Sequence, residues 1–437
     1  MTYDFTRGCF YASIPSMRTT LHDTVNSRFY APLEAALAQS HFTRNCPGFT
    51  DSEFLEAGVG RVIDDAFTGR AWVQKLQQLV SMRLSVSNFF KSLGSQRRLD
   101  MLGEVAEHVR LQLDRDCCAY DPLAVYPELD GFAVYGGDGH YEAHAAHAPE
   151  FEGKALVPGA LYALNLRSHS LSLLDVTRPK RKREHEVSVL QRLGSTKLRM
   201  SEPVGTKVIL VYDMAAIDYR HWHKWKAKGL YMISCEKSNS KAETVGINHW
   251  DRNDQRNTGI EADELVGVFC GVMLRRIHYR DPADGKLYVY MTSEMTLPPG
   301  LIAFLYKLRW DIEKVFDEKK NKLNEKKAWA TSPTARCQQA HFTALAHNLM
   351  VLLELHLASE EGIVDEKNQS KRLKRLRKTI EDIRRRGLKP NPMVANLSRA
   401  TQRSLQFIRW LRCHIFGQTP YAEAVENLRP YMEAYIT

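Results

Sequence analysis

The spacing of apolar residues divides the chain into helical ends and a mixed centre. Up to about residue 115, apolar side chains recur at every third or fourth position, for example at 54–67, 71–79 and 85–93. A period close to that of the α-helix predicts short amphipathic helices. The pattern therefore predicts a small helical region at 1–115.

Beyond residue 116, short apolar runs replace the helical pattern. The run KVILVY at 207–212 is continuous and rich in β-branched residues, which is typical of a strand buried on both faces. Similar runs predict strands at 131–135, 161–166, 171–176 and 229–235, and helical spacing predicts helices at 185–193 and 217–228. The predicted order for 116–235 is three strands, helix, strand, helix, strand, which is the first part of an α/β core.

The pattern changes twice more towards the C-terminus. Residues 236–298 predict a β-rich insertion, with strands at 264–279 and 286–292 joined by the turn sequence DPADG. After Pro298-Pro299-Gly300 a long helix is predicted to run to about Lys327, and a second helix follows at 333–358. These helices make 299–360 the second part of the core, and 361–437 is a basic, mostly helical region.

Composition limits the class of protein. A chain of 437 residues with 44% hydrophobic and 26% charged residues is long enough for two or three folded units and is not disordered as a whole. The most apolar stretch, 340–357, contains three histidines, an asparagine and a glutamate, so it predicts a buried helix and not a membrane span. The N-terminus lacks the pattern of a signal peptide. Eight cysteines without a C-x-x-C pair favour a reduced, cytoplasmic protein.

The excess of basic residues is clustered. The net charge is +10, and residues 371–389 alone carry ten basic residues against two acidic ones. A second cluster, RPKRKR, lies at 178–183. Clustered cations suit a polyanion such as nucleic acid, because each neutralised phosphate releases counterions. A solvated basic face is the alternative for each cluster.

Two aspartates follow predicted strands of the core. Asp138 follows the strand at 131–135, and Asp213 directly follows KVILVY. Carboxylates at neighbouring strand ends can converge, and hard divalent cations prefer oxygen ligands. An aspartate in such a place is otherwise a turn or cap residue. Asp130 is a weaker alternative to Asp138, because it precedes its strand.

The segment YKLRWDIEKVFDEKK gathers polar side chains along one edge of a predicted helix. With 100° per residue, Tyr306, Arg309, Glu313, Phe316 and Lys320 fall within an arc of about 80°. This edge lies beside the apolar stripe that faces the core. By spacing alone, a salt-bridged solvent edge is the simpler explanation, since Arg309 and Glu313 can pair at i,i+4.

This spacing resembles a known family. Tyr306, Arg309, Glu313 and Lys320 are similar to the Y-R-E-K signature of the IS4-type DDE transposases, and the surrounding R-W-x-I-E sequence agrees with it. The resemblance covers about 125–350. It implies an RNase H-like core with a β-rich insertion, flanked by helical N- and C-terminal regions.

The same resemblance implies a site and a reaction. Asp138, Asp213 and Glu313 would be the catalytic carboxylates that hold two Mg²⁺ ions, with Mn²⁺ able to substitute. Tyr306, Arg309 and Lys320 would grip the DNA backbone. The implied function is a cut-and-paste transposase of an insertion sequence, an endonuclease that nicks the ends of the element and then joins them by phosphoryl transfer. A DNA hairpin intermediate is a further hypothesis.

The resemblance also implies partners. These are double-stranded DNA, both as terminal inverted repeats and as target, and a second copy of the chain, because synapsis of two ends implies at least a dimer. The N-terminal helical domain would serve DNA binding or dimerisation, and the bacterial-type protein would be nucleoid-associated.

Two departures from the family pattern concern the neighbours of the aspartates. Gly139-His140 follows Asp138, and Met214-Ala215 follows Asp213, where many relatives have other pairs. An inactive DNA-binding derivative and a metal-dependent nuclease without strand transfer remain the alternatives.

Three other features have competing explanations. His140, His144 and His147 have a spacing that could bind zinc, but no further ligand motif completes such a site, so a place at the edge of the active site or a DNA contact is favoured. The aromatic and basic segment at 219–225 suits nucleic acid and helix packing equally. Trp250 could stack on a flipped base.

Overall fold

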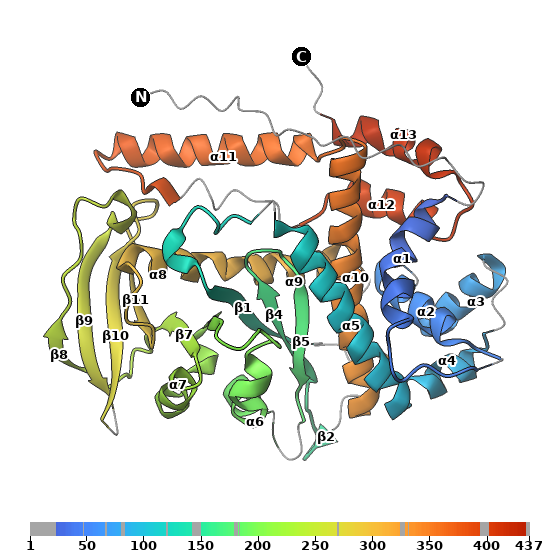
Figure 1. Cartoon of the computed structure of the whole chain (residues 1–437), viewed down its shortest axis with the longest axis horizontal. Coiled ribbons are helices and arrows are strands. Elements are labelled where there is room, and N and C mark those ends of the chain that lie inside the picture. Colours follow the sequence, from blue (N-terminus) through green and yellow to red (C-terminus); the bar gives the residue numbers. More distant parts are fainter. Residues whose placement is uncertain are drawn as a thin grey trace.

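The computed structural model describes residues 23–433 apart from 47, 66–67, 80–83, 119–120, 142–149, 179–181, 183, 269–270, 324–327, 331 and 394–401. Figure 1 shows a large sheet with helices on both faces and a helical body at one side. The strands are β1 (Phe132–Tyr141), β2 (Glu150–Phe151), β3 (Lys154–Ala155), β4 (Gly159–Asn165), β5 (Leu171–Val176), β6 (Lys207–Val211), β7 (Leu230–Cys235), β8 (Glu243–Ile247), β9 (Ile260–Val268), β10 (Val272–Arg280) and β11 (Leu287–Thr292).

The α-helices occupy both ends of the chain and the connections between strands. They are α1 (Val25–Leu37), α2 (Asp51–Ile63), α3 (Gly69–Leu79), α4 (Val86–Ser92), α5 (Gln96–Asp116), α6 (Glu186–Leu198), α7 (Tyr219–Lys226), α8 (Pro299–Leu308), α9 (Trp310–Asn321), α10 (Pro333–Glu360), α11 (Glu366–Arg385), α12 (Leu405–His414) and α13 (Tyr421–Met432). Short 3₁₀ turns include η3 (Met214–Ala216) and η4 (Gln255–Asn257).

One nine-stranded sheet forms the centre, in the order β5-β4-β1-β6-β7-β11-β10-β9-β8. β1, β6 and β7 are parallel, and the other pairings of this sheet are antiparallel. The predicted order of three strands, helix, strand, helix, strand is confirmed, with the small hairpin of β2 and β3 inserted after β1. The strands predicted at 236–298 continue the same sheet through β11, which pairs with β7. The prediction of one strand at 264–279 is wrong, because this run is divided between β9 and β10, which pair antiparallel.

The apolar run of β6 is continuous because both faces of the sheet are covered. Val208, Leu210 and Tyr212 pack with α6 and α7 on one face. Ile209 and Val211 pack with α8 and α9 on the other. Successive side chains of a strand alternate between the faces. The burial therefore explains why no polar residue interrupts KVILVY.

The helical ends of the chain share one core. Apolar residues of α1 to α5 pack with those of α10, α12 and α13 in a single buried cluster. Helix α10 is long and apolar enough to cross a membrane by length and composition, but 72% of its most apolar window is buried inside the protein. The prediction of a buried helix at 340–357 is thus confirmed.

The helix predicted from Pro298 to about Lys327 is two helices, so the prediction of one continuous helix is wrong. α8 ends at Leu308 and α9 begins at Trp310. At the junction the Arg309 N–H donates to the carbonyls of both Leu305 and Tyr306, which tightens the turn. α9 ends at Asn321, and residues 324–327 lie outside the described part of the chain.

Candidate active site

Asp138 and Asp213 occupy equivalent positions on neighbouring parallel strands. The last residue pair of β1 and β6 is Gly136 with Val211, and each aspartate stands two residues beyond it. Cys235 has the same position on β7, two residues after Ile233, which pairs with Val211. Because neighbouring strands are about 4.8 Å apart, the three side chains form a row at the carboxyl end of the parallel strands.

This row lies on the face that α8 and α9 cover. Ile233 and Val211 belong to that face, and residues two positions further along each strand share it. Asp213 also caps η3, because its Oδ1 accepts a hydrogen bond from the Ala215 N–H at 2.7 Å. The predicted place of Asp213 just beyond a strand is confirmed.

The strand around Asp138 is longer than predicted. β1 continues to Tyr141, so Asp138 lies within it, and the prediction that the strand stops before Asp138 is wrong. The extension is held by β4, which pairs antiparallel with β1 as far as Tyr141. The parallel pairing of β1 with β6 stops at Gly136. Asp138 therefore lies two residues beyond the end of this pairing. Asp130, the weaker alternative, is exposed before the amino end of β1.

The junction of α8 and α9 rests directly on β1. A Cβ atom at Gly136 would lie 3.5 Å from the Arg309 Cα. The absence of a side chain at Gly136 therefore allows the helix backbone to approach the strand closely. This contact places the predicted signature residues of the helix above Asp138.

Arg309 connects the helix with the strand. Its Nη2 donates to the Glu313 Oε1 at 2.6 Å, and its Nη1 lies 4.0 Å from the Asp138 Oδ2. Arg309 is 8% exposed, so this pair is not a solvent edge. Burial lowers the pKa of Arg309, but Tyr306, Glu313 and Asp138 outweigh it and the pKa is raised overall.

The environment of Asp138 favours its neutral form. Burial raises the pKa of this carboxyl from 3.8 to about 7, with a further increase from the nearby charge of Glu186. The Gly139 N–H, which donates to Asp138 Oδ1 at 2.8 Å, and Arg309 oppose this shift, while Asp213 adds to it. Carboxylates crowded in this way ionise together only when a cation compensates them.

Glu186 is a site neighbour that the sequence analysis missed. It begins α6, is 9% exposed, and approaches β1 from the face opposite α9. A Cβ at Gly139 would lie 2.5 Å from its Oε1, so the glycine makes room for the carboxylate. The signal in the sequence was the Gly-Gly-Asp-Gly run, in which both residues on that face, Gly137 and Gly139, lack a side chain.

Tyr306 packs inside the site. Its ring centroid lies 4.9 Å from that of Tyr290, and the Arg309 guanidinium carbon lies 5.5 Å from its centroid. Burial raises the pKa of Tyr306 well above its ordinary value. Burial also raises the pKa of the Cys235 thiol, which a hydrogen bond with Tyr306 opposes. Cys235 was not predicted as a site residue, because its place depends on the register of β7.

The remaining predicted residues lie along α9 and β1. Lys320 is exposed, whereas its neighbour Lys319 is buried with its Nζ 4.5 Å from the ring centroid of Tyr162. His140 lies in β1 and is buried against Phe316, and burial with the charges of Lys319 and Lys320 lowers its pKa to about 2. The predicted His144 and His147 lie outside the described residues.

The donor chemistry of the site suits a divalent cation. Asp138, Asp213 and Glu313 offer carboxylate oxygens, and the buried guanidinium of Arg309 is the cation beside two of them. Among the residues that the structure describes, no three His, Cys, Asp or Glu side chains are grouped closely enough to hold a metal ion. Because Arg309 contacts Glu313 and lies near Asp138, a bound ion would compete with Arg309 for these oxygens.

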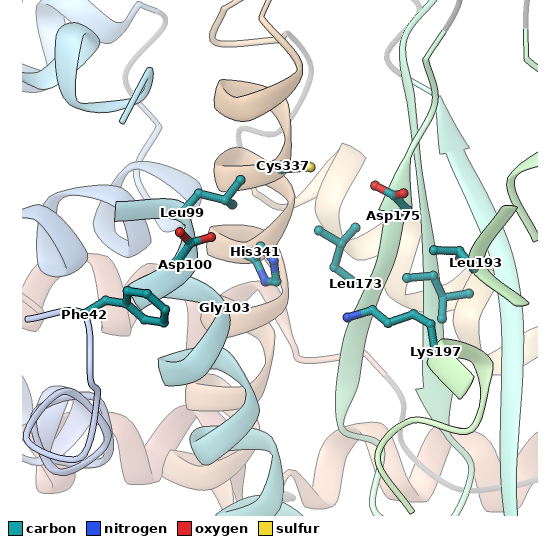
Figure 2. A pocket seen from close by; sticks show the side chains of 11 residues that line it. Phe42, Leu99, Asp100, Gly103, Leu173, Asp175, Leu193, Lys197, Cys337 and His341 are labelled. Carbon is teal, nitrogen blue, oxygen red and sulfur yellow. The ribbon is translucent and has the colours of Figure 1, made fainter. Parts of the chain in front are cut away.

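A separate cavity lies away from these residues. Figure 2 shows a cavity of about 400 Å³ between α5, α10, β5 and α6, with Asp100, Lys197 and His341 among its lining residues. None of the predicted site residues lines it. This cavity is therefore separate from the candidate active site.

Helix α11 presents a basic surface. It runs across the molecule at the top of Figure 1. The exposed basic residues of α11 and the turn after it are Lys371, Lys374, Arg375, Arg377, Lys378, Arg384, Arg385, Arg386 and Lys389. Most of the second basic cluster at 178–183 lies outside the described residues.

Trp250 lies in the loop after β8 and is half-buried. The Arg252 guanidinium carbon lies 5.3 Å from its ring centroid. In the segment 219–225, Trp222 and Trp225 are buried against the sheet and Trp222 Nε1 donates to the Ala216 carbonyl. Helix packing therefore explains these two tryptophans.

Comparisons with known proteins identify a domain. Residues 162–349 match the family described as the transposase DDE domain. The matched range includes Asp213, Tyr306, Arg309, Glu313 and Lys320, and it begins after Asp138. The match supports a DDE transposase.

Two further comparisons add little. Curated proteins gave no match. Among solved structures, the cryo-EM structure of a piggyBac transposase synaptic complex with hairpin DNA is 12% identical, with a TM-score of 0.37, and the alignment covers 95% of this chain and 84% of that chain. A likeness this low does not establish a common fold.

Proposed function

We propose that this protein is a cut-and-paste DNA transposase of the IS4-like DDE class. It would nick the ends of its element hydrolytically and then join the freed 3′-hydroxyl ends to target DNA. The match to the transposase DDE domain supports the class. The order β5-β4-β1-β6-β7, with α6 and α7 as the crossover helices, supports an RNase H-like core.

One observation carries the proposal more than any other. Asp138 and Asp213 are in register on the adjacent parallel strands β1 and β6. The Arg309–Glu313 pair lies over β1, next to Asp138. A turn or cap role for each aspartate does not require this convergence. Carboxylates from three separate segments, two on adjacent strands and one on the helix that covers them, are the kind of ligand that two-metal phosphoryl transfer uses.

Asp138, Asp213 and Glu313 would hold Mg²⁺, or Mn²⁺ in its place, and the bound ions would activate the attacking oxygen and stabilise the leaving one. Tyr306 and Arg309 would orient the DNA strand beside the carboxylates. Lys320, which is exposed, would contact a backbone phosphate. No residue of the chain needs to form a covalent bond to DNA in this scheme.

The basic surface of α11 would bind duplex DNA outside the site. Nine exposed cations in and just after one helix favour a polyanion, and phosphate contacts of this kind position a duplex without reading its sequence. Two element ends must meet for cut-and-paste transposition, so we propose that the active assembly is at least a homodimer.

The test is cleavage of a labelled duplex carrying the element end and its flank, with Mg²⁺. We expect specific nicking by the wild type and none by Glu313→Gln. Asp317→Asn is the matched control, because Asp317 is exposed one turn further along α9 and should leave cleavage intact. EDTA should abolish the reaction.

Three outcomes separate the alternatives. Nicking followed by joining to a target plasmid supports the transposase. Nicking without joining under any metal condition would assign a nuclease. Tight end binding without cleavage by any variant would contradict an enzyme and assign a DNA-binding derivative.

A further inference from the structure

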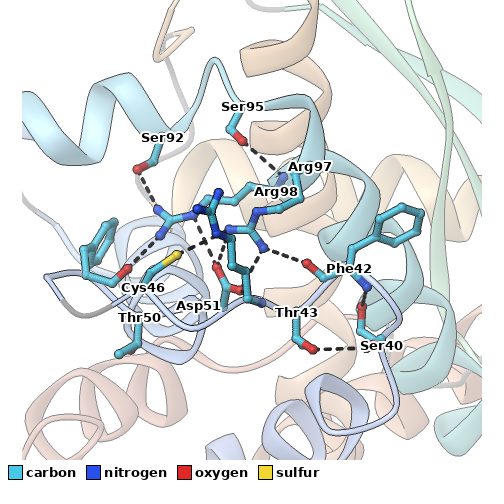
Figure 3. Close-up of polar contacts among 12 residues, drawn as sticks. Ser40, Phe42, Thr43, Cys46, Thr50, Asp51, Ser92, Ser95, Arg97 and Arg98 are labelled. Atoms are coloured by element: carbon cyan, nitrogen blue, oxygen red, sulfur yellow. Dashed lines mark hydrogen bonds and ion pairs between the residues drawn. The ribbon is translucent and has the colours of Figure 1, made fainter.

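A basic cavity lies in the helical body. It has a volume of about 540 Å³ and lies between the loop before α2, helix α4 and the start of α5. Figure 3 shows the polar contacts of Asp51, Arg97 and Arg98 beside it. Its lining residues are Arg44, Asn45, Cys46, Gly48, Phe49, Asn88, Lys91, Ser92, Ser95, Arg97 and Arg98. Four of these are cations and none is acidic, so the cavity favours an anion.

The cations exceed the nearby negative charge. Asp51 accepts hydrogen bonds from Arg97 at 2.7 and 2.8 Å and lies 3.4 Å from the Arg98 Nε. One carboxylate thus serves two guanidinium groups. Arg98 is 5% exposed and is otherwise surrounded by the rings of Phe49 and Phe54 and by the Phe49 carbonyl and the Ser92 hydroxyl. Its burial lowers its pKa, which reflects incomplete charge compensation.

The other two cations are available to a ligand. Arg44 and Lys91 are exposed, and neither side chain forms an ion pair with a residue in the described part of the chain. Both line the cavity, Arg44 from the loop before α2 and Lys91 from α4. Exposed Asn88 lies one helical turn before Lys91 on the same face.

The walls of the cavity are held rigidly. The Ser95 hydroxyl caps α5, Arg98 bonds to Ser92, and Gln338 of α10 donates to the Ser95 carbonyl at 2.9 Å. Gln338 is fully buried. Helix α10 also packs against β5 of the central sheet, so an anion in the cavity would be at a defined position relative to the catalytic core.

We propose that this cavity binds one backbone phosphate of duplex DNA. The inference rests on the proposed function, and it assigns a phosphate contact to the helical N-terminal region. The paired donors of a guanidinium match the oxygens of a phosphate, and the cavity carries four cations and no acidic lining residue. Arg44 and Lys91 would both contact this phosphate, and Asn88 would extend the contact along the strand.

The test measures binding of a random-sequence duplex as a function of salt. The double variant Arg44→Ala/Lys91→Ala removes the free cations and retains the Arg97–Asp51 pair. Loss of one phosphate contact should lower the slope of log K against log salt by about 0.9 and weaken binding severalfold at low salt. The matched control is Lys228→Ala, an exposed lysine before the amino end of β7, which should change neither quantity.

The outcomes are distinct. An unchanged slope in the double variant, with wild-type DNA cleavage and thermal stability, overturns this inference and leaves the proposed function intact. A wild type that binds no DNA overturns both. If inorganic phosphate stabilises the wild type but not the double variant while neither binds DNA, the cavity is an anion site for another ligand and the DNA assignment is wrong.

Discussion

The Arg309 guanidinium donates to the Glu313 carboxylate at 2.6 Å across one turn of helix, in a position where Arg309 is almost fully buried. The same guanidinium lies 4.0 Å from Asp138 on the central strand. A pair that could have been a surface salt bridge is therefore the contact between the α8–α9 junction and the sheet. This placement makes Arg309 a site residue and not a surface charge.

Replacement of Arg309 by alanine should reduce the cleavage rate by about 100-fold or more at saturating Mg²⁺. The guanidinium is a preorganised donor at the place where charge develops in phosphoryl transfer. Loss of one such donor usually lowers the rate of the chemical step by about 100-fold or more. Single-turnover cleavage measures the effect. Lys314→Ala is the control, because Lys314 pairs with Asp311 and not with the carboxylates of the site. Equal rates for Arg309→Ala and Lys314→Ala would contradict this role.

Glu186→Gln should shift the acid limb of the pH–rate profile towards lower pH. The charge of Glu186 raises the pKa of Asp138, so its removal allows Asp138 to lose its proton at lower pH and to act as a ligand there. The measurement is cleavage between pH 5 and 8 at fixed Mg²⁺. A profile that does not move, or that moves to higher pH, would show that Glu186 does not act on Asp138.

Glu56→Gln should stabilise the protein at pH 8 and not at pH 4. Burial, together with Glu34, raises the pKa of Glu56 from 4.5 to about 7. A carboxyl whose pKa is raised by folding contributes stability below its unfolded pKa and loses it as the pH rises through about 7. The expected gain at pH 8 is about 1–3 kcal/mol in the free energy of unfolding, measured with urea. Glu381→Gln, at an exposed position of α11, serves as the control and should show no such difference between the two pH values.

Gly300→Ala should lower both stability and cleavage. A Cβ at Gly300 would lie 2.0 Å from the Arg256 backbone carbonyl oxygen, so the start of α8 would have to move. Overpacking of this kind costs about 1–3 kcal/mol, and α8 carries Tyr306 and leads into Arg309. Gly103→Ala is the comparison, since nothing lies within 4 Å of its Cβ and the helix should gain up to about 1 kcal/mol. The measurement is thermal unfolding of both variants. Equal changes in melting temperature for Gly300→Ala and Gly103→Ala would contradict the packing argument.

Much of the fold follows from local patterns. The run KVILVY required burial on both faces, and the turn sequence at 281–285 required a hairpin tip; the structure contains both. The continuous helix from Pro298 was predicted wrongly, because the tightened turn at Arg309 has no helix-breaking residue. The common core of the N-terminal and C-terminal helices was not predictable, since apolar faces do not indicate their partners.

The same division holds for the site. By itself the sequence determined that Arg309 and Glu313 lie one helical turn apart and that Asp213 follows a buried strand, because helix period and strand length are local properties. Only the tertiary structure decided that Asp138 and Asp213 are in register, that Arg309 reaches Asp138, and that Glu186 approaches through Gly139. These relationships depend on strand register and close packing between distant segments, and local sequence patterns do not specify either.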